Sequence, residues 1–367
     1  MRYLSLDVFR GLTICLMIIV NSMGPGADPY PLLDHAEWFG FTFADFVFPS
    51  FLFAMGNSMA FSSASKLSNS DYVSKALKRS ILLFGVGLLL AWFPFFLFNS
   101  EGIFEWKYFE NLRFMGVLQR IALCYLIAAL LVRYLNFHQI LWASAVLLLG
   151  YWGLLVWGAP SGMAFDKAAN FGSVIDNFVI PQSHIFRRDD GFEPEGLLGT
   201  LPAVVNVLAG YLAAVAIQNA KDKLAIIKKL IGIGILCIIA ANIWALSFPI
   251  SKKLWTSSFV TLCNGLDLIL LAALVYFIEI KTRKFGAKPF EIFGKNPLAI
   301  YVFSIVLLKI LLVARAAPTQ SLHVWLGDFV QAVIPGSLGS LIFAIIFTLV
   351  CWGFGLWLDR KQIIIKL

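Results

Sequence analysis

The sequence contains little charge: Asp, Glu, Lys and Arg make up 14% of its 367 residues, while apolar residues make up 60%. A soluble globular domain carries about 25% charged residues, and a disordered chain is poor in apolar residues, so both classes are excluded. The alternation of apolar and polar residues that marks the strands of membrane barrels is absent. We also find no internal repeat and no low-complexity segment. These absences predict an all-α integral membrane protein.

The cysteines lack any metal-binding or redox spacing, because each stands alone in an apolar run. Such cysteines are typical of small buried side chains, and no disulfide framework is implied. The net charge of +8 raises the alternative of a nucleic-acid or anionic-ligand binder. We attribute it instead to the Lys and Arg that enrich the cytoplasmic loops of membrane proteins. We therefore expect neither a metal nor a nucleic-acid partner.

About ten apolar runs have a length near 20 residues, at which a helix crosses the lipid bilayer. We expect residues 1–367 to form one domain, a single bundle of about ten transmembrane helices. The expected spans are 8–23, 41–62, 79–98, 114–134, 139–158, 196–217, 228–249, 257–279, 296–314 and 337–358.

Lys and Arg collect in alternate loops of this arrangement. The basic loops 63–79, 218–229 and 280–295 fall on the same side as both chain ends. Because cytoplasmic loops are enriched in Lys and Arg, the N- and C-termini are predicted to be cytoplasmic. The loops predicted on the outer side are 24–40, 99–113, 159–195, 250–256 and 315–336. Loop 250–256, which contains Lys252 and Lys253, is the one exception to the charge rule.

Polar side chains inside a span are costly and are therefore candidates for function. Asp45 stands one turn into the second span, shortly before Pro49. Arg120 lies about a third of the way into the fourth span and needs an anionic partner, either Asp45 or a phosphate of a ligand. Arg113, seven residues earlier, falls on the same helix face. Further polar residues within the spans are Gln119, Asn206, Asn264 and Asp267.

Other polar residues have a structural explanation beside a functional one. Asn296 precedes Pro297 at the start of the ninth span, a pattern typical of a helix N-cap. Asp7 and Arg10, three residues apart in the first span, fit a local ion pair. The long outer loop 159–195 fits contact with a polar substrate such as a sugar, and it equally fits a solvated connector.

The first outer loop has the strongest case for chemistry. The first span holds only about 16 apolar residues, too few to cross a hydrocarbon core of about 30 Å, so Asn21 is expected within the outer half of the membrane. His35 stands a few residues before the second span, so both side chains can face one shallow chamber. A neutral imidazole can accept a proton from an attacking amine or hydroxyl, and an amide can donate to a developing oxyanion. A structural or solvent-facing histidine is the alternative.

Several sequence blocks resemble the heparan-α-glucosaminide N-acetyltransferase family. The blocks are LDVFRGLT at 6–13, VN at 20–21, HAEW at 35–38, TFADFVFP at 42–49, GVLQRI at 116–121, PEGLLGTLP at 194–202 and GKNPL at 294–298. They are spread over nearly the whole chain. The family includes a lysosomal enzyme and bacterial relatives linked to the use of N-acetylglucosamine.

The resemblance implies an acyl-CoA-dependent N-acetyltransferase in a bacterial inner membrane. Acetyl-CoA from the cytoplasm is the implied co-substrate, and a glucosamine-type sugar or glucosamine-ended glycan on the outer side is the implied acceptor. His35 is expected to act as general base or acetyl carrier, with Asn21 as the second catalytic residue. A homodimer is also implied. The candidate substrate- or cofactor-binding residues are Asp45, Arg113, Gln119, Arg120, Asn206 and Asn296.

A transporter for amino sugars such as N-acetylglucosamine is the alternative function. Ten spans with polar residues inside the membrane fit it, as do helices broken at Pro49 or Pro202. The missing repeats and the concentration of polar residues at the first outer loop favour the enzyme. A membrane scaffold without any ligand is a third alternative.

Overall fold

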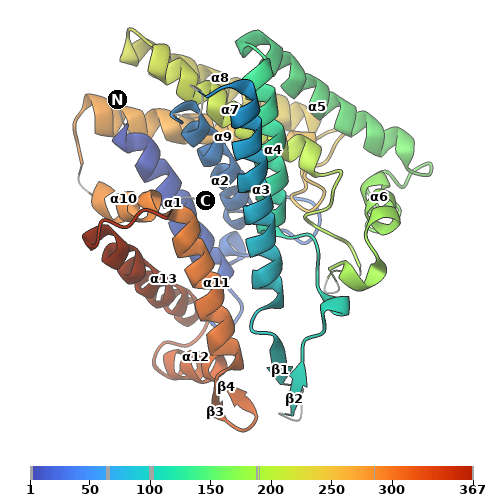
Figure 1. The fold of residues 1–367 in the computed structure, drawn as a ribbon, viewed down its shortest axis with the longest axis vertical. Coiled ribbons are helices and arrows are strands. Elements are labelled where there is room, and N and C mark those ends of the chain that lie inside the picture. Colours follow the sequence, from blue (N-terminus) through green and yellow to red (C-terminus); the bar gives the residue numbers. More distant parts are fainter. Residues whose placement is uncertain are drawn as a thin grey trace.

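The apolar runs form long helices that cross and pack on one another (Figure 1). The structure, a computed structural model, describes residues 3–62, 67–98, 103–186, 189, 191–284 and 286–365. The long helices are α1 (Leu4–Asn21), α2 (Phe43–Ala60), α3 (Asn69–Trp92), α4 (Val117–Tyr134), α5 (Phe137–Gly158), α7 (Thr200–Asn219), α8 (Lys223–Trp244), α9 (Ser257–Leu274), α11 (Pro297–Val313) and α13 (Ser337–Arg360). A π-helical turn, η6 (Val275–Ile280), continues α9.

Shorter elements connect these helices. The short helices are α6 (Phe171–Val179), α10 (Ala287–Lys295) and α12 (Leu322–Val333), and the 3₁₀ turns are η1 (Pro31–Leu33), η3 (Phe109–Asn111) and η4 (Gln182–His184). Two antiparallel hairpins pair β1 (Phe96–Phe98) with β2 (Phe104–Trp106), and β3 (Arg315–Ala317) with β4 (Gln320–Ser321). The hairpins lie with α12 at the end of the molecule away from the N-terminus (Figure 1).

The predicted helical class is confirmed, and a helix occupies each range predicted for a span. Among the described residues, seven helices are long and apolar enough to cross a membrane, and the bent pair α10–α11 makes up to eight. Helices α2 and α3 are not among them. Asp45 and Asn57 make α2 more polar, and Lys75, Lys78 and Arg79 do the same for the first half of α3. The count of ten crossings and the cytoplasmic position of the termini remain predictions.

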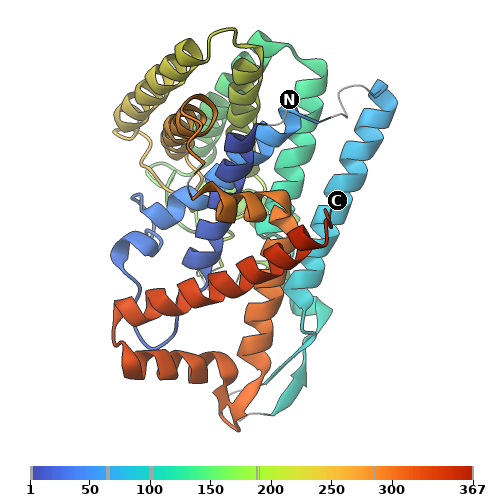
Figure 2. The same ribbon diagram turned by 90° about the vertical axis from the view of Figure 1, so that its left-hand side faces the viewer.

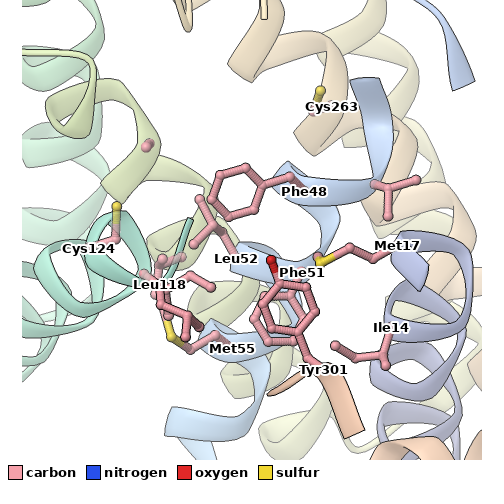
Figure 3. Close-up of a cluster of buried hydrophobic side chains, with 14 of the residues drawn as sticks. Ile14, Met17, Phe48, Phe51, Leu52, Met55, Leu118, Cys124, Cys263 and Tyr301 are labelled. Atoms are coloured by element: carbon pink, nitrogen blue, oxygen red, sulfur yellow. The ribbon is translucent and has the colours of Figure 1, made fainter. Parts of the chain in front are cut away.

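Helices α2 and α7 pack at the centre of the bundle. A Cβ at Gly56 would lie 1.9 Å from the carbonyl oxygen of Val207, and one at Gly210 would lie 2.0 Å from that of Phe53. Glycine at both positions therefore lets the two backbones touch, as small residues do in membrane helices. Apolar side chains of α1, α2, α4 and α11 fill the space beside this contact (Figure 3).

Helix α10 packs on α1 and meets α11 at an angle of 86° (Figure 2). Asn296 lies at this bend, but its side chain makes no capping hydrogen bond to α11. Its amide instead donates to the carbonyl of Ile363 at 2.9 Å, and its oxygen accepts from the backbone N–H of Ile365 at 2.9 Å. The predicted N-cap position of Asn296, with Pro297 in the first turn, is confirmed, but the side chain fixes the C-terminal tail instead of capping α11. The predicted Asp7–Arg10 pair is confirmed at 2.5 Å.

The segments predicted on the outer side are tied to one another by hydrogen bonds. The backbone N–H of Gly40 donates to the carbonyl of Ile250 at 2.9 Å. The indole of Trp38 donates to the carbonyl of Phe165 at 2.9 Å. These bonds join the loop after α1 to the segment before α9 and to the loop after α5. Segments far apart in sequence are thereby held around one cavity.

Candidate active site

A cavity of about 370 Å³ lies where these loops meet the ends of α1 and α2. Four of the candidate residues line it: Asn21, His35, Asp45 and Arg113. Asn21 is the last residue of α1, and Asp45 lies in the first turn of α2. The expectation that Asn21 and His35 share one chamber is therefore met by the geometry. Tyr301 of α11 and Trp255 close other parts of the wall.

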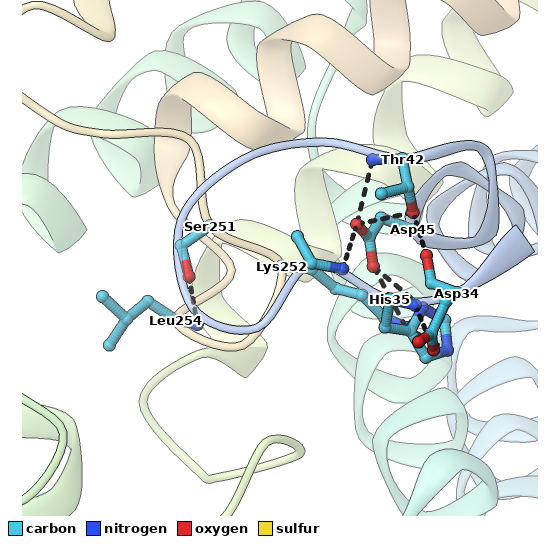
Figure 4. A network of polar contacts seen from close by, with 8 residues as sticks. Asp34, His35, Thr42, Asp45, Ser251, Lys252 and Leu254 are labelled. Carbon is cyan, nitrogen blue, oxygen red and sulfur yellow. Dashed lines mark hydrogen bonds and ion pairs between the residues drawn. The ribbon is translucent and has the colours of Figure 1, made fainter. Parts of the chain in front are cut away.

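His35 and Asp45 form a hydrogen-bonded pair at this cavity (Figure 4). The distance from Nδ1 of His35 to Oδ1 of Asp45 is 2.9 Å. The other oxygen, Oδ2, accepts the backbone N–H groups of Thr42 at 3.0 Å and Ala36 at 3.2 Å. The Asp45 side chain is 0% exposed and that of His35 is 40% exposed. Because a carboxylate only accepts, Nδ1 carries the hydrogen of a neutral ring and Nε2 keeps its lone pair.

Lys252 completes this cluster from the segment between α8 and α9. Its Nζ lies 3.0 Å from Nδ1 and 3.1 Å from Nε2 of His35, and 3.7 Å from Oδ1 of Asp45. Burial lowers the pKa of Lys252, and the charge of Asp45 works against that shift. The pair of a buried carboxylate and a nearby ammonium leaves the cluster without net charge when His35 is neutral.

Arg113 belongs to a second ionic cluster on the same cavity wall. Its guanidinium pairs with Glu193 and Glu195 and stacks on the ring of Phe186 at 4.2 Å. Burial opposes the charge of Arg113, but the two carboxylates outweigh it and raise its pKa. Burial also raises the pKa of Glu193, against the effect of Arg113. A ligand phosphate at Arg113 would therefore have to compete with two carboxylates already in place.

Arg120 does not pair with Asp45, so that predicted pair is wrong. The oxygens of Asp45 already contact His35, Lys252 and backbone N–H groups. Arg120 is 1% exposed and donates from Nη2 to the carbonyl of Gly196 at 2.9 Å. Its guanidinium also lies 4.9 Å from the ring centre of Trp255. Arg120 therefore packs behind Trp255, which lines the cavity, and does not line it itself.

Gln119 and Asn206 also lie outside the cavity lining. The amide of Asn206 donates to Oδ1 of Asn264 at 3.0 Å, and its oxygen accepts the indole N–H of Trp255 at 3.2 Å. Gln119 is buried against α3, where a Cβ at Gly87 would lie 2.6 Å from its oxygen. Asn296, at the bend described above, is not part of the lining either. These residues hold helices and Trp255 in place.

The cavity is also lined by four residues that were not predicted as site residues: Lys252, Lys253, Glu195 and Tyr301. One signal could have identified the two lysines, because loop 250–256 was the exception to the charge rule for outer loops. Cations retained on the outer side against this bias indicate a local use for their charge. Glu195 and Tyr301 gave no comparable signal.

The outer loop 159–195 contributes Phe186, Asp189 and Glu195 to the cavity wall. Asp189 forms ion pairs with Lys167 at 2.5 Å and with Lys253 at 2.8 Å. The end of this loop therefore packs against the cavity, while Met163, Phe178 and Val179 earlier in the loop are exposed. Contact with a sugar remains a prediction.

We expect the free energy of unfolding to depend on pH because of Asp176, which lies in α6. Its side chain accepts the backbone N–H of Leu197 at 2.8 Å, and burial raises its pKa from 3.8 to about 6. Between these values the folded state retains a proton that the unfolded state has lost. The free energy of unfolding therefore falls as pH rises from about 4 to about 6, by about 3 kcal/mol from this group.

Asp176→Asn removes this titration and keeps an oxygen for Leu197. We expect its melting temperature in detergent to fall less than that of the wild type between about pH 4 and pH 7. Melting curves recorded at several pH values test this expectation. The same decrease in both proteins would contradict the assignment.

Comparison with known proteins gives two findings. Residues 2–159 match the family model described as "Heparan-alpha-glucosaminide N-acetyltransferase, catalytic". The heparan-alpha-glucosaminide N-acetyltransferases of Homo sapiens and Mus musculus are 28% and 26% identical to the chain over 357 residues. These alignments cover 82% of this chain and 52% and 53% of the two relatives. The chain thus spans about half the length of the curated relatives it matches.

Proposed function

We propose, from its similarity to heparan-alpha-glucosaminide N-acetyltransferases, that this chain is a transmembrane acetyltransferase. Acetyl-CoA supplied from the cytoplasm donates the acetyl group, and the amine of a glucosamine-type sugar on the outer side accepts it. We place the protein in the inner membrane of a bacterium. The observation that supports the proposal is the His35–Asp45 pair at a cavity of about 370 Å³. That volume lies within the range of small-molecule sites.

The proposed reaction uses His35 as general base. Asp45 accepts the hydrogen on Nδ1, which leaves the lone pair of Nε2 available for a proton of the sugar amine. The amine nitrogen bonds to the thioester carbonyl carbon as His35 takes this proton. The carbon–sulfur bond then breaks, and the CoA thiolate takes the proton from His35. The products are the N-acetylated sugar and CoA, and His35 is again neutral.

Asn21 is the candidate donor to the oxyanion that forms on the carbonyl oxygen. Loss of one such donor costs about 10²–10³ in kcat. We therefore expect Asn21→Ala to lower kcat by about this factor, with a smaller effect on KM. Steady-state acetyl transfer from acetyl-CoA to glucosamine measures both constants. An unchanged kcat would remove Asn21 from the mechanism.

His35 as acetyl carrier is the second route at the same site. In that route Nε2 bonds to the carbonyl carbon and the carbon–sulfur bond breaks, so CoA leaves as the thiolate. The amine then bonds to the same carbon, the bond to the ring breaks with its electron pair returning to Nε2, and the proton lost by the amine passes to the thiolate. Incubation with labelled acetyl-CoA without acceptor separates the two routes. Label on His35 that chases into glucosamine supports the carrier, whereas direct transfer leaves the protein unlabelled.

An acetyl-transfer assay with purified protein in detergent tests the proposed function. We expect product from acetyl-CoA with glucosamine and with small glucosamine-ended glycans. Thermal stabilisation by acetyl-CoA is expected as well, because a ligand that binds the folded state raises its stability. A protein stabilised by N-acetylglucosamine but indifferent to acetyl-CoA would instead fit an amino-sugar transporter.

A further inference from the structure

Lys252 lies against the imidazole that serves as base in the proposed reaction. Its Nζ lies 3.0 Å from Nδ1 and 3.1 Å from Nε2 of His35. The Nδ1 hydrogen is directed at Oδ1 of Asp45 at 2.9 Å, so the lone pair of the neutral ring is on Nε2. An atom equally close to both nitrogens of one ring lies over the ring face, away from the in-plane direction of that lone pair. The ammonium of Lys252 therefore acts on the imidazole through its charge and leaves Nε2 open.

We propose that the charge of Lys252 offsets that of Asp45 beside His35, so that the imidazole stays unprotonated in the resting site and Nε2 is open to the arriving sugar amine. This inference deepens the proposed acetyl transfer and rests on it for its function. The contact between Lys252 and His35 is a feature of the structure and does not depend on the proposed function.

The backbone around Lys252 is held in a fixed conformation. The N–H of Ser251 donates to Oγ1 of Thr256 at 3.1 Å, and the N–H of Thr256 returns a bond to the carbonyl of Ser251 at 3.1 Å. Trp255 has a φ of 55°, in the left-handed region that an aromatic residue rarely adopts. Such a conformation persists only where surrounding contacts enforce it, and it occurs often at functional sites.

Contacts of the Trp255 side chain hold its backbone in this conformation. Its side chain is 1% exposed, its indole donates to Asn206, and the guanidinium of Arg120 lies over its ring. The loop of His35 is joined to the same segment through the bond from Gly40 to Ile250. The positions of Lys252 and His35 are therefore set together by the fold.

Charged groups from several elements surround the imidazole. Asp45 of α2 faces Nδ1, and Lys252 faces both ring nitrogens. Asp34, in the same loop as His35, accepts the backbone N–H of His35 at 2.8 Å. The remaining charged residues of the cavity wall are Arg113, Asp189, Glu195 and Lys253, and each of them has an ion-pair partner or lines the wall beside one.

A cation at this distance opposes protonation of the ring. An imidazolium would face a second positive charge at about the same distance from both ring nitrogens. Removing Lys252 should therefore let solvent protons occupy Nε2 at higher pH, so the base is lost earlier as pH falls.

The test compares Lys252→Met with Lys252→Arg and with the control Lys253→Met. The control removes the neighbouring lysine, whose charge pairs with Asp189. In protein labelled with ¹⁵N-histidine, the His35 signals are assigned by their loss in His35→Gln. We expect the titration midpoint of His35 to rise by about one pH unit in Lys252→Met. We expect it to stay near the wild-type position in Lys252→Arg and in Lys253→Met.

The acid limb of the pH profile of kcat/KM should also move to higher pH in Lys252→Met. It should stay near the wild-type position in Lys252→Arg and in Lys253→Met. A His35 midpoint that does not change in Lys252→Met would overturn the inference. The spectroscopic readout does not need turnover, so it separates the two proposals. Absence of acetyl transfer in the folded wild type would overturn the proposed function, while the titration would still decide the role of Lys252.

Discussion

Replacing His35 by alanine is expected to lower acetyl transfer by about 10²–10⁴, the contribution of a positioned acid–base group. The loss falls on kcat, because the imidazole acts in the chemical step. The fold should be retained, since the side chain is 40% exposed and its ring contacts are Asp45 and Lys252. Steady-state kinetics with acetyl-CoA and glucosamine, together with a melting curve, measure both effects.

His138→Ala is the matched control for this substitution. His138 is exposed in the first turn of α5 and does not line the cavity. Its replacement should leave kcat unchanged. Turnover of His35→Ala close to that of the control would remove His35 from the mechanism.

Replacing Asp45 by asparagine should cause a loss of similar size without removing the base. The asparagine oxygen can still accept from the N–H groups of Thr42 and Ala36. Its amide then donates toward Nδ1 of His35, which moves the ring hydrogen to Nε2 and eliminates the lone pair that the reaction uses. An analogous tautomer change in the serine-protease triad lowers kcat by about 10⁴. We expect a decrease of about 10²–10⁴ in kcat.

Asp34→Asn serves as the control for Asp45→Asn, because Asp34 is an exposed carboxylate in the loop of His35 that accepts the backbone N–H of His35 and not its ring. ¹⁵N-histidine spectra of both variants report the tautomer directly. If Asp45→Asn keeps the Nδ1–H tautomer and full activity, the buried carboxylate does not set the state of the base.

Much of the fold could be predicted from the sequence because the span length and apolar content are local properties. Most helices occupy the expected ranges with shifts of a few residues, as for α1 at Leu4–Asn21 against 8–23, whereas α3 begins ten residues before its predicted span 79–98. Asn21 and His35 were expected to face one chamber, and both line the cavity, because residues at the same ends of neighbouring spans approach one another. Their shared cavity follows from topology more than from any motif.

The remaining features depend on contacts between distant segments. Lys252 meets His35 across 217 positions of the chain, which no local pattern records. Arg120 could not be paired correctly, because its partner is the backbone carbonyl of Gly196 rather than a charged side chain. Asn296 has the local pattern of a helix cap, yet the C-terminal tail takes its hydrogen bonds. In each case the partner is determined by how distant segments pack together, and the local sequence does not specify it.

Acetyl transfer across a sealed membrane tests the central proposal most directly. The protein is reconstituted in vesicles with labelled acetyl-CoA on the predicted cytoplasmic side only and glucosamine on the opposite side only. The account predicts labelled N-acetylglucosamine on the glucosamine side with the wild type, and a loss of at least about 10² with His35→Ala. Product that forms only when both substrates share one side, or that forms equally with His35→Ala, would contradict it.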